Sequence, residues 1–194
     1  MKLLNASAPI IVVLLISIVL ILLLKLFILS KKIKYVDEAN MWHKLALTDD
    51  LTGIYNRNAY NLTLDKNKRS IKKRITGIIL FDIDDFKIIN DTKGHMAGDI
   101  VLKRVARVLL DVFPEPEYRV FRIGGDEFSV LSESASEEEI IRCLIALKNN
   151  LSFENISLSK GYSMVKDNIE ESFKCADDML YADKESRKMK CSYE

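Results

Sequence analysis

The fold of this chain is decided by the stretch Arg122-Ile123-Gly124-Gly125-Asp126-Glu127-Phe128, in which two glycines separate apolar segments. Paired glycines let the backbone turn tightly, and the flanking segments Val120–Ile123 and Phe128–Leu131 predict two strands joined at that turn. The hairpin would hold the carboxylates of Asp126 and Glu127 at its tip, where they suit Mg²⁺ and, through it, phosphates. A surface turn without function has the same composition, so the hairpin alone identifies no site.

The segments around the hairpin alternate between strand and helix patterns. Ile75–Phe81 and Ile156–Val165 predict strands, whereas apolar residues recur at helical spacing in Asp99–Phe113, Glu137–Leu151 and Ile169–Met189. Because a hairpin stands among interleaved helices and strands, the order favours an α+β domain with a largely antiparallel sheet over a doubly wound parallel one.

The size and composition of the chain narrow the classes of protein to which it can belong. Its 194 residues suffice for one domain with a sizeable core plus an appendage. A formal net charge of +1 favours no particular partner, and no feature of the sequence indicates a nucleic-acid partner. The cysteines Cys143, Cys175 and Cys191 are scattered and lack metal-ligand spacing, so we expect reduced thiols in a cytosolic domain.

An apolar segment near the N-terminus, Ala6–Leu24, carries no charge. About 20 residues at roughly 1.5 Å each span the hydrocarbon core of a bilayer. A cleaved signal peptide and a buried core helix are the alternatives, but lysines cluster in residues 31–34 and only Lys2 precedes the run, which is a stop-transfer pattern. We therefore expect residues 1–29 to form a single-pass anchor in the inner (cytoplasmic) membrane, with the following domain in the cytoplasm.

Residues 30–48 are largely polar and contain no glycine or proline, so we expect them to form a cytoplasmic linker helix that continues the membrane helix. Positions spaced alternately by three and four residues predict a short coiled-coil seam, formed by Leu26, Leu29, Ile33, Val36, Asn40, His43 and Leu47. The polar Asn40 and His43 weaken this seam, so a single amphipathic helix remains the alternative. The remaining residues, 49–194, predict one globular domain.

Carboxylates follow the strand predicted at Ile75–Phe81, in the run Asp82-Ile83-Asp84-Asp85. If this strand neighbours the hairpin, Asp82 and Asp126 converge and could hold one or two Mg²⁺ ions together with a backbone carbonyl. A turn or a helix N-cap has the same composition and is the alternative.

Polar groups that suit a guanine base come next in the chain. The Asn90 amide offers both a donor and an acceptor, and the Asp99 carboxylate can accept from the hydrogens of guanine N1 and N2. Gly94 and Gly98 permit sharp turns near a ligand. A loop in which Asp99 caps the following helix is the alternative.

Four blocks of this sequence, in the right order and spacing between Thr48 and Lys188, resemble the GGDEF family. The blocks are Asp49-Asp50-Leu51-Thr52-Gly53-Ile54-Tyr55-Asn56-Arg57; Phe81-Asp82-Ile83-Asp84-Asp85-Phe86-Lys87 with Asn90-Asp91 and Gly94-His95…Gly98-Asp99; Arg122–Phe128; and Ala176-Asp177…Leu180-Tyr181…Lys184. The resemblance implies a diguanylate cyclase, which condenses two GTP molecules into cyclic di-GMP and releases two pyrophosphates.

The resemblance also implies a fold, a cofactor and a partner. The fold would be a ferredoxin-like palm, similar to that of nucleotide cyclases, with a five-stranded, largely antiparallel sheet flanked by helices. Mg²⁺ would be the cofactor, with Mn²⁺ as an alternative ion. Each domain would hold one GTP, so catalysis would need a homodimer, and an unidentified membrane protein could regulate it. The alternative function is a non-catalytic module that binds GTP or a cyclic dinucleotide; the presence of Asp82, Asp126 and Glu127 favours the enzyme.

The resemblance assigns roles to individual residues. Asp82 and Asp126 would coordinate the metal through their side chains and Ile83 through its backbone carbonyl. Glu127 would be the second catalytic acid, which assists metal or proton handling. The remaining residues would bind substrate: Asn90, Asp99 and the nearby His95 at the guanine, Phe86 and Lys87 along the triphosphate, and Lys184 and Lys188 at the terminal phosphates.

Two departures from the family pattern lie near the C-terminus. Arg187 stands where the family usually has glycine and Lys188 where it has a basic residue, so the sequence leaves open which of them reaches a phosphate. Lys160 lies inside the last strand, where an apolar residue is usual, and an edge position or a snorkelling side chain would explain it.

Overall fold

The computed structural model describes the backbone of residues 4–70, 74–153, 155–166 and 168–191. Side chains of residues 4–11, 14, 35–44, 152, 153, 190 and 191 lie outside this description. The chain divides into two compact units, Met1–Leu45 and Ala46–Glu194.

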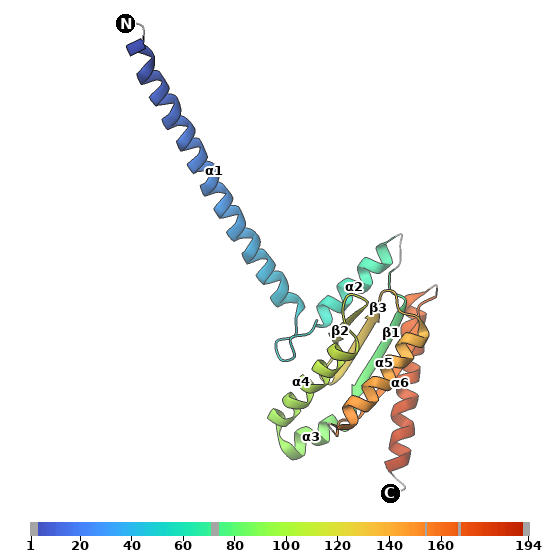
Figure 1. Cartoon of the computed structure of the whole chain (residues 1–194). Coiled ribbons are helices and arrows are strands. Elements are labelled where there is room, and N and C mark those ends of the chain that lie inside the picture. The colour runs from blue at the N-terminus through green and yellow to red at the C-terminus, as the bar shows by residue number, and fades with distance from the viewer. Residues whose placement is uncertain (1–3, 71–73, 154, 167, 192–194) are drawn as a thin grey trace. The chain divides into compact units, whose positions relative to one another are not determined.

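Most of helix α1 (Leu4–Leu47) lies in the first unit (Figure 1). Its large apolar side chains are exposed wherever they are described between Val12 and Leu29. Over the part of the chain that the structure describes, no helix has both the length and the apolar character needed to cross a membrane. The span predicted at Ala6–Leu24 lies partly outside the described side chains, and the seam positions Val36, Asn40 and His43 lie outside them.

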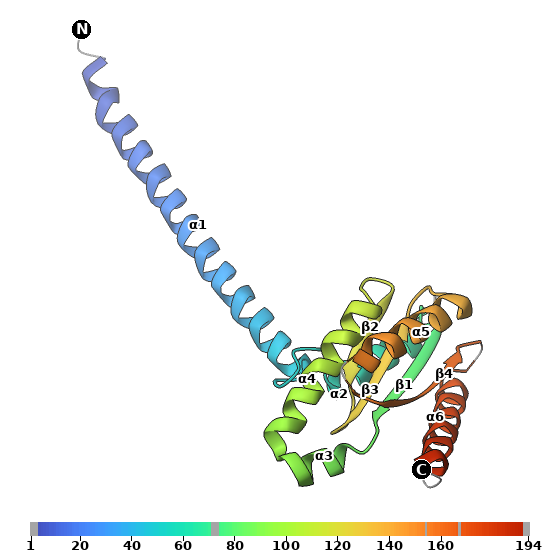
Figure 2. The same cartoon turned by 60° about the horizontal axis from the view of Figure 1, so that its bottom comes forward.

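A four-stranded sheet with the strand order β2-β3-β1-β4 forms the centre of the second unit (Figures 1 and 2). The strands are β1 (Gly77–Ile83), β2 (Tyr118–Arg122), β3 (Glu127–Ser132) and β4 (Leu158–Met164). All three pairings between neighbouring strands are antiparallel. The prediction of an α+β fold with an antiparallel sheet is therefore confirmed.

The expected count of five strands is wrong for the described residues, which form four. Beside the outer edge of β2, Tyr55 makes only an isolated bridge to Phe121 and another to Thr48. The chain turns back between these bridges, because Gly53 adopts a φ of 75° and Asp49 N donates to Ile54 O at 2.8 Å. Since this turn satisfies its backbone groups locally, no extended segment is left to pair along β2.

Helices cover both faces of the sheet (Figures 1 and 2). They are α2 (Arg57–Arg69), α3 (Phe86–Lys93), α4 (His95–Val112), α5 (Glu137–Phe153) and α6 (Ile169–Cys191). In β1, Ile79 and Phe81 pack in the core that includes α4 and α5, whereas Ile78 and Leu80 pack in the core that includes α2 and α6. Burial on both faces explains why the β1 sequence is continuously apolar instead of alternating.

Helix α6 covers the sheet edge formed by β4. The amide of Lys160 donates to Asp183 Oδ2 at 3.0 Å, and the amide of Tyr162 donates to Met179 Sδ at 3.5 Å. Between them, a Cβ atom at Gly161 would collide with the α6 backbone. The glycine thus lets the helix approach the strand closely, and the half-buried Lys160 does lie on an edge strand.

Candidate active site

The β2–β3 turn is fixed by Arg122, the last residue of β2. Its guanidinium donates to the carbonyl oxygen of Gly125 through Nη2 at 2.7 Å and through Nε at 3.1 Å. The same side chain donates through Nη1 to Asp49 Oδ1 at 3.0 Å, and this ion pair is largely buried. Arg122 therefore ties the tip of the hairpin to the loop that follows α1.

Two carboxylates converge where β1 meets the hairpin. Asp82 of β1 lies opposite Glu127 in the strand register, and the amide of Ile83 donates to the carbonyl oxygen of Asp126 at 3.2 Å. Burial raises the pKa of the Asp82 carboxyl, and the charges of Asp126 and Asp84 raise it further against the opposing effect of Lys184. A cation close to these acids relieves the repulsion among them.

Lys184 of α6 supplies that positive charge in the structure. Its Nζ lies 2.7 Å from Asp82 Oδ2, although the two residues are far apart in sequence. The lysine is half-buried, and α6 holds it close to the strand end. An incoming cation at Asp82 would release Lys184 towards another anion, such as a phosphate.

The donor set fits Mg²⁺ better than a metal that needs a closed protein cage. Within the described ranges, no group of three or more histidine, cysteine or acidic side chains is placed to hold a metal. The side chains of Asp82 and Asp126, with the Ile83 carbonyl, would supply three oxygen ligands. Mg²⁺ characteristically binds through one or two carboxylates and keeps its other positions for water and substrate phosphates.

A polar cluster anchors the loop after β1 to β4 and α6. Asp84 accepts hydrogen bonds from the hydroxyls of Ser157 and Ser159, both at 2.5 Å. Arg187 donates to Ser157 Oγ at 2.6 Å, to Asp84 Oδ2 at 3.3 Å and to Asp183 Oδ2 at 3.3 Å. This cluster fixes the position of the backbone that carries the Ile83 carbonyl.

The cluster also shows that Arg187 and Lys188, which the sequence alone could not distinguish, have different surroundings. The Arg187 guanidinium is engaged by Asp84 and Asp183. The Lys188 side chain is 73% exposed, and its ammonium lies 3.1 Å from Glu185 Oε1. Arg187 therefore has a structural role in the loop after β1, while Lys188 stays at the surface.

The residues predicted to bind guanine lie on α3 and α4. The side chain of Asn90 packs against Gly98. A Cβ atom at position 98 would collide with the side-chain oxygen Oδ1 of Asn90. Asp99 and His95 are exposed on the first turns of α4. Asp99 lies inside α4, whose N-cap is Gly94, so the interpretation of Asp99 as a helix cap is wrong.

The start of α3 lies directly beside the carboxylates. Its N-cap residue is Asp85, which adopts a φ of 56° and makes no side-chain capping hydrogen bond, so N-capping does not explain the acidic run. Phe86 is half-buried against the core and Lys87 is exposed. The first amides of a helix have no partner within the helix, so those of α3 could donate to an anion bound beside the carboxylates.

Sequence reasoning missed the anchors of the site: Asp49, Arg122, Ser157 and Ser159. Asp49 and Arg122 lie 73 positions apart, so no local spacing indicates their pairing. A partial signal does exist, because both residues stand inside blocks that resemble the family. Ser157 and Ser159 stand two positions apart, as residues on one face of a strand do, but nothing in the sequence names Asp84 as their acceptor.

The Asp49→Asn substitution should reveal how much the anchor contributes to stability. Burial raises the pKa of Asp49, but hydrogen bonds from Thr52 and Arg122 outweigh it and hold the pKa below 3.8. The ionised form therefore stabilises the folded state above that pH, and this contribution is lost as pH falls through the folded-state pKa. We expect Asp49→Asn to lower the free energy of unfolding by about 1–2 kcal/mol at pH 7.

Chemical denaturation of both proteins between pH 7 and pH 3 checks this expectation. The difference in free energy of unfolding should stay constant near neutral pH and shrink below pH 3.8, where free aspartate also takes up its proton. The exposed neighbour Asp50 provides the control, since Asp50→Asn should change little at any pH. A difference that grows towards low pH would refute the anchoring role.

The protein family described as "Diguanylate cyclase, GGDEF domain" matches residues 46–190 of the chain. "Probable diguanylate cyclase DgcI" of Escherichia coli (strain K12) is 33% identical over 155 residues, which cover 77% of this chain and 34% of DgcI. An uncharacterized membrane protein of Staphylococcus aureus (strain USA300) is 30% identical over 201 residues, covering 91% of this chain and 55% of that protein. The chain thus spans about a third to a half of the length of these relatives.

Solved GGDEF-domain structures resemble most of this chain. The coiled coil and GGDEF domain of DgcB from Caulobacter crescentus, in complex with c-di-GMP, matches with a TM-score of 0.73 at 25% identity. This match covers 81% of the chain and 90% of the DgcB chain. The GGDEF domain of PA1120 (TpbB or YfiN) from Pseudomonas aeruginosa has a TM-score of 0.62 at 29% identity, covering 72% of the chain and 89% of that domain.

Proposed function

Because the chain belongs to the GGDEF family of diguanylate cyclase domains, we propose that it condenses two GTP molecules into cyclic di-GMP and releases two pyrophosphates. The observation that carries this proposal is the convergence of Asp82, Asp126 and Lys184 at one end of β1. Degenerate relatives that only bind nucleotides would not need this set of charges. All of the acids that the proposed chemistry requires are present.

The proposed site holds GTP by its phosphates. Asp82, Asp126 and the Ile83 carbonyl would bind Mg²⁺, which neutralises phosphate charge and activates the attacking hydroxyl when bound. Lys184 would exchange its contact with Asp82 for the terminal phosphates. The amides of Phe86 and Lys87 would donate to the triphosphate at the positive end of α3.

The proposed reaction needs two copies of the chain. The 3′-hydroxyl of each GTP attacks the α-phosphorus of the other, and each attack breaks one bond to pyrophosphate. Each hydroxyl loses its proton as the new P–O bond forms, and we propose that Glu127 at the hairpin assists that transfer. One domain offers one set of Asp82, Asp126 and Lys184, so we propose a homodimer with two such sites facing each other.

Guanine recognition is proposed for Asn90 and Asp99, with His95 nearby. We expect Asn90→Ala to lower kcat/KM for GTP about ten- to a hundredfold, chiefly through KM, because a buried hydrogen bond to the base is lost. Steady-state kinetics with GTP checks this. Asn149→Ala, at an exposed position of α5, is the matched control. Unchanged KM in Asn90→Ala would refute a role for Asn90 in binding the base.

We also propose that residues 1–29 anchor the chain in the cytoplasmic membrane. The support is the sequence pattern of this segment and the exposure of its described apolar side chains between Val12 and Leu29. After cell lysis, the full chain should sediment with membranes and resist extraction by alkaline carbonate. Release of the chain by carbonate would contradict the proposal.

One experiment separates the enzyme from a binding module. The purified full chain is incubated with GTP and Mg²⁺, and the nucleotides are separated by chromatography and identified by mass. Cyclic di-GMP and pyrophosphate are the expected products. GTP binding without turnover by a verified dimer would instead identify a non-catalytic module.

A further inference from the structure

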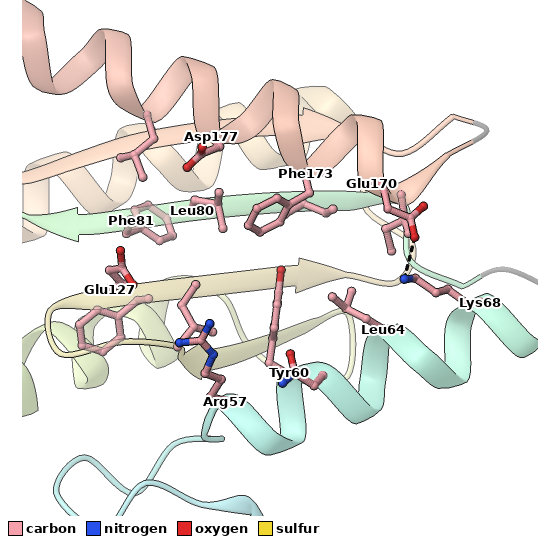
Figure 3. Close-up of a pocket in the computed structure, with 16 residues that line it drawn as sticks. Arg57, Tyr60, Leu64, Lys68, Leu80, Phe81, Glu127, Glu170, Phe173 and Asp177 are labelled. Carbon is pink, nitrogen blue, oxygen red and sulfur yellow. Dashed lines mark ion pairs between the residues drawn. The ribbon is translucent and has the colours of Figure 1, made fainter.

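A pocket of about 390 Å³ between α2 and α6 includes Glu127 among the residues that line it (Figure 3). Because Glu127 has a catalytic role in the proposed function, this pocket is not separate from the candidate active site. A smaller pocket, of about 110 Å³, is lined by residues of α5, of β4, of α6 and of the loop between α5 and β4. Among the residues that the structure describes at this smaller pocket, none has a proposed role in binding metal, GTP or guanine.

Basic side chains from three elements line the smaller pocket: Lys148 of α5, Lys160 of β4 and Arg187 of α6. None of the described residues that line it is acidic. Lys160 stands where the family usually has an apolar residue, and Arg187 where it usually has glycine. The fold brings these two departures from the family pattern to one pocket, and a shared ligand of negative charge gives both of them a reason.

Lys160 lies on the face of β4 that packs towards α5. Leu158 and Tyr162, its neighbours at two positions before and after, pack in the core that includes α4 and α5, and alternate residues of a strand share a face. Lys160 is half-buried, and its ammonium makes no hydrogen bond or ion pair with the residues that the structure describes. Burial of a charge without a partner is costly, so an anion beside Lys160 would stabilise this position.

Arg187 lines the pocket from α6 and is itself held in place. Its guanidinium donates to Asp84, to Ser157 and, through two nitrogens, to Asp183. These contacts do not use all the N–H donors of a guanidinium. Because the two carboxylates offset the charge of Arg187, the attraction of the pocket for an anion depends chiefly on Lys148 and Lys160.

The size of the pocket limits its occupant to a small ion. A volume of about 110 Å³ lies below the range of about 300–1,000 Å³ that is usual for sites of drug-sized molecules, yet it exceeds the roughly 30 Å³ that one water molecule occupies in the liquid. Since the basic side chains come from three elements, they reach an occupant from different directions. A tetrahedral oxyanion has oxygens in several directions, whereas a carboxylate has its oxygens on one side only.

We propose that the pocket of Lys148, Lys160 and Arg187 binds a small tetrahedral oxyanion of the phosphate type, with the Lys160 ammonium as its central contact. Lysine is a usual partner of phosphate groups. Most of the other residues that line the pocket are apolar, and low polarity around an ion pair strengthens it. The proposal does not depend on catalysis, because a chain that fails to convert GTP would still contain the pocket.

Isothermal titration calorimetry with inorganic phosphate measures the binding. The purified full chain is kept in maltoside micelles with EDTA and without Mg²⁺, and the ionic strength is held constant with NaCl. We expect saturable binding by the unmodified chain. Lys160→Met keeps a long side chain but removes its charge, and should raise the Kd about tenfold or more. Lys174→Met, at an exposed position of α6 outside the pocket, is the matched control and should bind as the unmodified chain does.

Thermal stability gives an independent readout. Without phosphate, the Tm of Lys160→Met should equal or exceed that of the unmodified chain, because a half-buried charge without a partner is removed. Phosphate should raise the Tm of the unmodified chain and of Lys174→Met, and should leave that of Lys160→Met nearly constant. A clear fall in the Tm of Lys160→Met without phosphate would show that the ammonium already has a partner within the protein, and would contradict the proposal.

Titration with pyrophosphate distinguishes two sources of the anion, because pyrophosphate is the product released in the proposed reaction. If free phosphate is the occupant, pyrophosphate should bind more weakly than phosphate; if the product is the occupant, it should bind more tightly. In both cases Lys160→Met should weaken the binding. Absence of saturable binding of either anion, or equal binding by the unmodified chain and Lys160→Met, would overturn the proposal.

Discussion

Replacing Asp126 with asparagine is expected to lower the kcat for cyclic di-GMP synthesis by at least about a hundred- to a thousandfold. Asparagine keeps the shape of the side chain but removes the negative charge that, with Asp82, attracts a cation. The backbone carbonyl of Asp126, which accepts from the Ile83 amide at 3.2 Å, is unchanged by the substitution. The hairpin should therefore stay folded while turnover is lost.

Two measurements make this result interpretable. The Tm of Asp126→Asn should equal or exceed that of the unmodified chain, because repulsion between Asp126 and Asp82 is relieved. Asp111→Asn, which removes an exposed carboxylate on α4, is the control for a simple change in net charge and should retain full activity. If Asp126→Asn kept a tenth or more of the normal kcat, Asp126 would not be the metal ligand that we propose.

The second large effect is expected from Gly161→Ala, at a position remote from any proposed ligand. The added methyl group would collide with the backbone of α6 at Ala176 and Leu180. These backbone atoms are held in place by the helix, so the collision can be relieved only if α6 as a whole shifts away from β4. We expect a loss of about 2–3 kcal/mol in the free energy of unfolding, or roughly 5–10 °C in Tm.

The same shift should lower activity, because Lys184 follows Leu180 by one turn of α6. Moving this helix separates the Lys184 ammonium from the Asp82 carboxylate, now 2.7 Å apart. A displacement of about 1 Å can cost about a hundredfold in rate, and we expect a fall of that order in kcat/KM. Gly125→Ala is the control for stability, because a Cβ atom there meets nothing within 4 Å. Equal stability of Gly161→Ala and the unmodified chain would refute the close packing of α6 on β4.

Several parts of the fold follow directly from sequence patterns. The hairpin is defined by Gly124 and Gly125 between two apolar segments, and β1 by a continuous apolar run. Their pairing brings Asp82 and Asp126 together because Asp82 lies near the end of β1 and Asp126 lies in the turn of the hairpin. The convergence therefore depends on local signals plus one assumption, that β1 and β3 are neighbours, which the sheet order confirms.

Other parts depend on packing that no local pattern encodes. A fifth strand was expected from the family resemblance, but Gly53 turns the chain before a strand can form along β2. Arg187 donates a hydrogen bond to Asp84, which lies 103 positions earlier in the sequence. The two residues meet because α6 packs against β4. The pocket of Lys148, Lys160 and Arg187 likewise depends on how α5, β4 and α6 pack together, which hydrophobic spacing within each element does not determine.

The most direct test of the central claim is the initial rate of cyclic di-GMP formation per chain, measured at saturating GTP and Mg²⁺ over a wide range of chain concentration. If each chain carries one GTP site and two must meet, the rate per chain should rise with concentration and then level off as dimers form. Asp126→Asn should give no product at any concentration. Absence of product from the unmodified chain, in a verified dimer with GTP bound, would contradict the account.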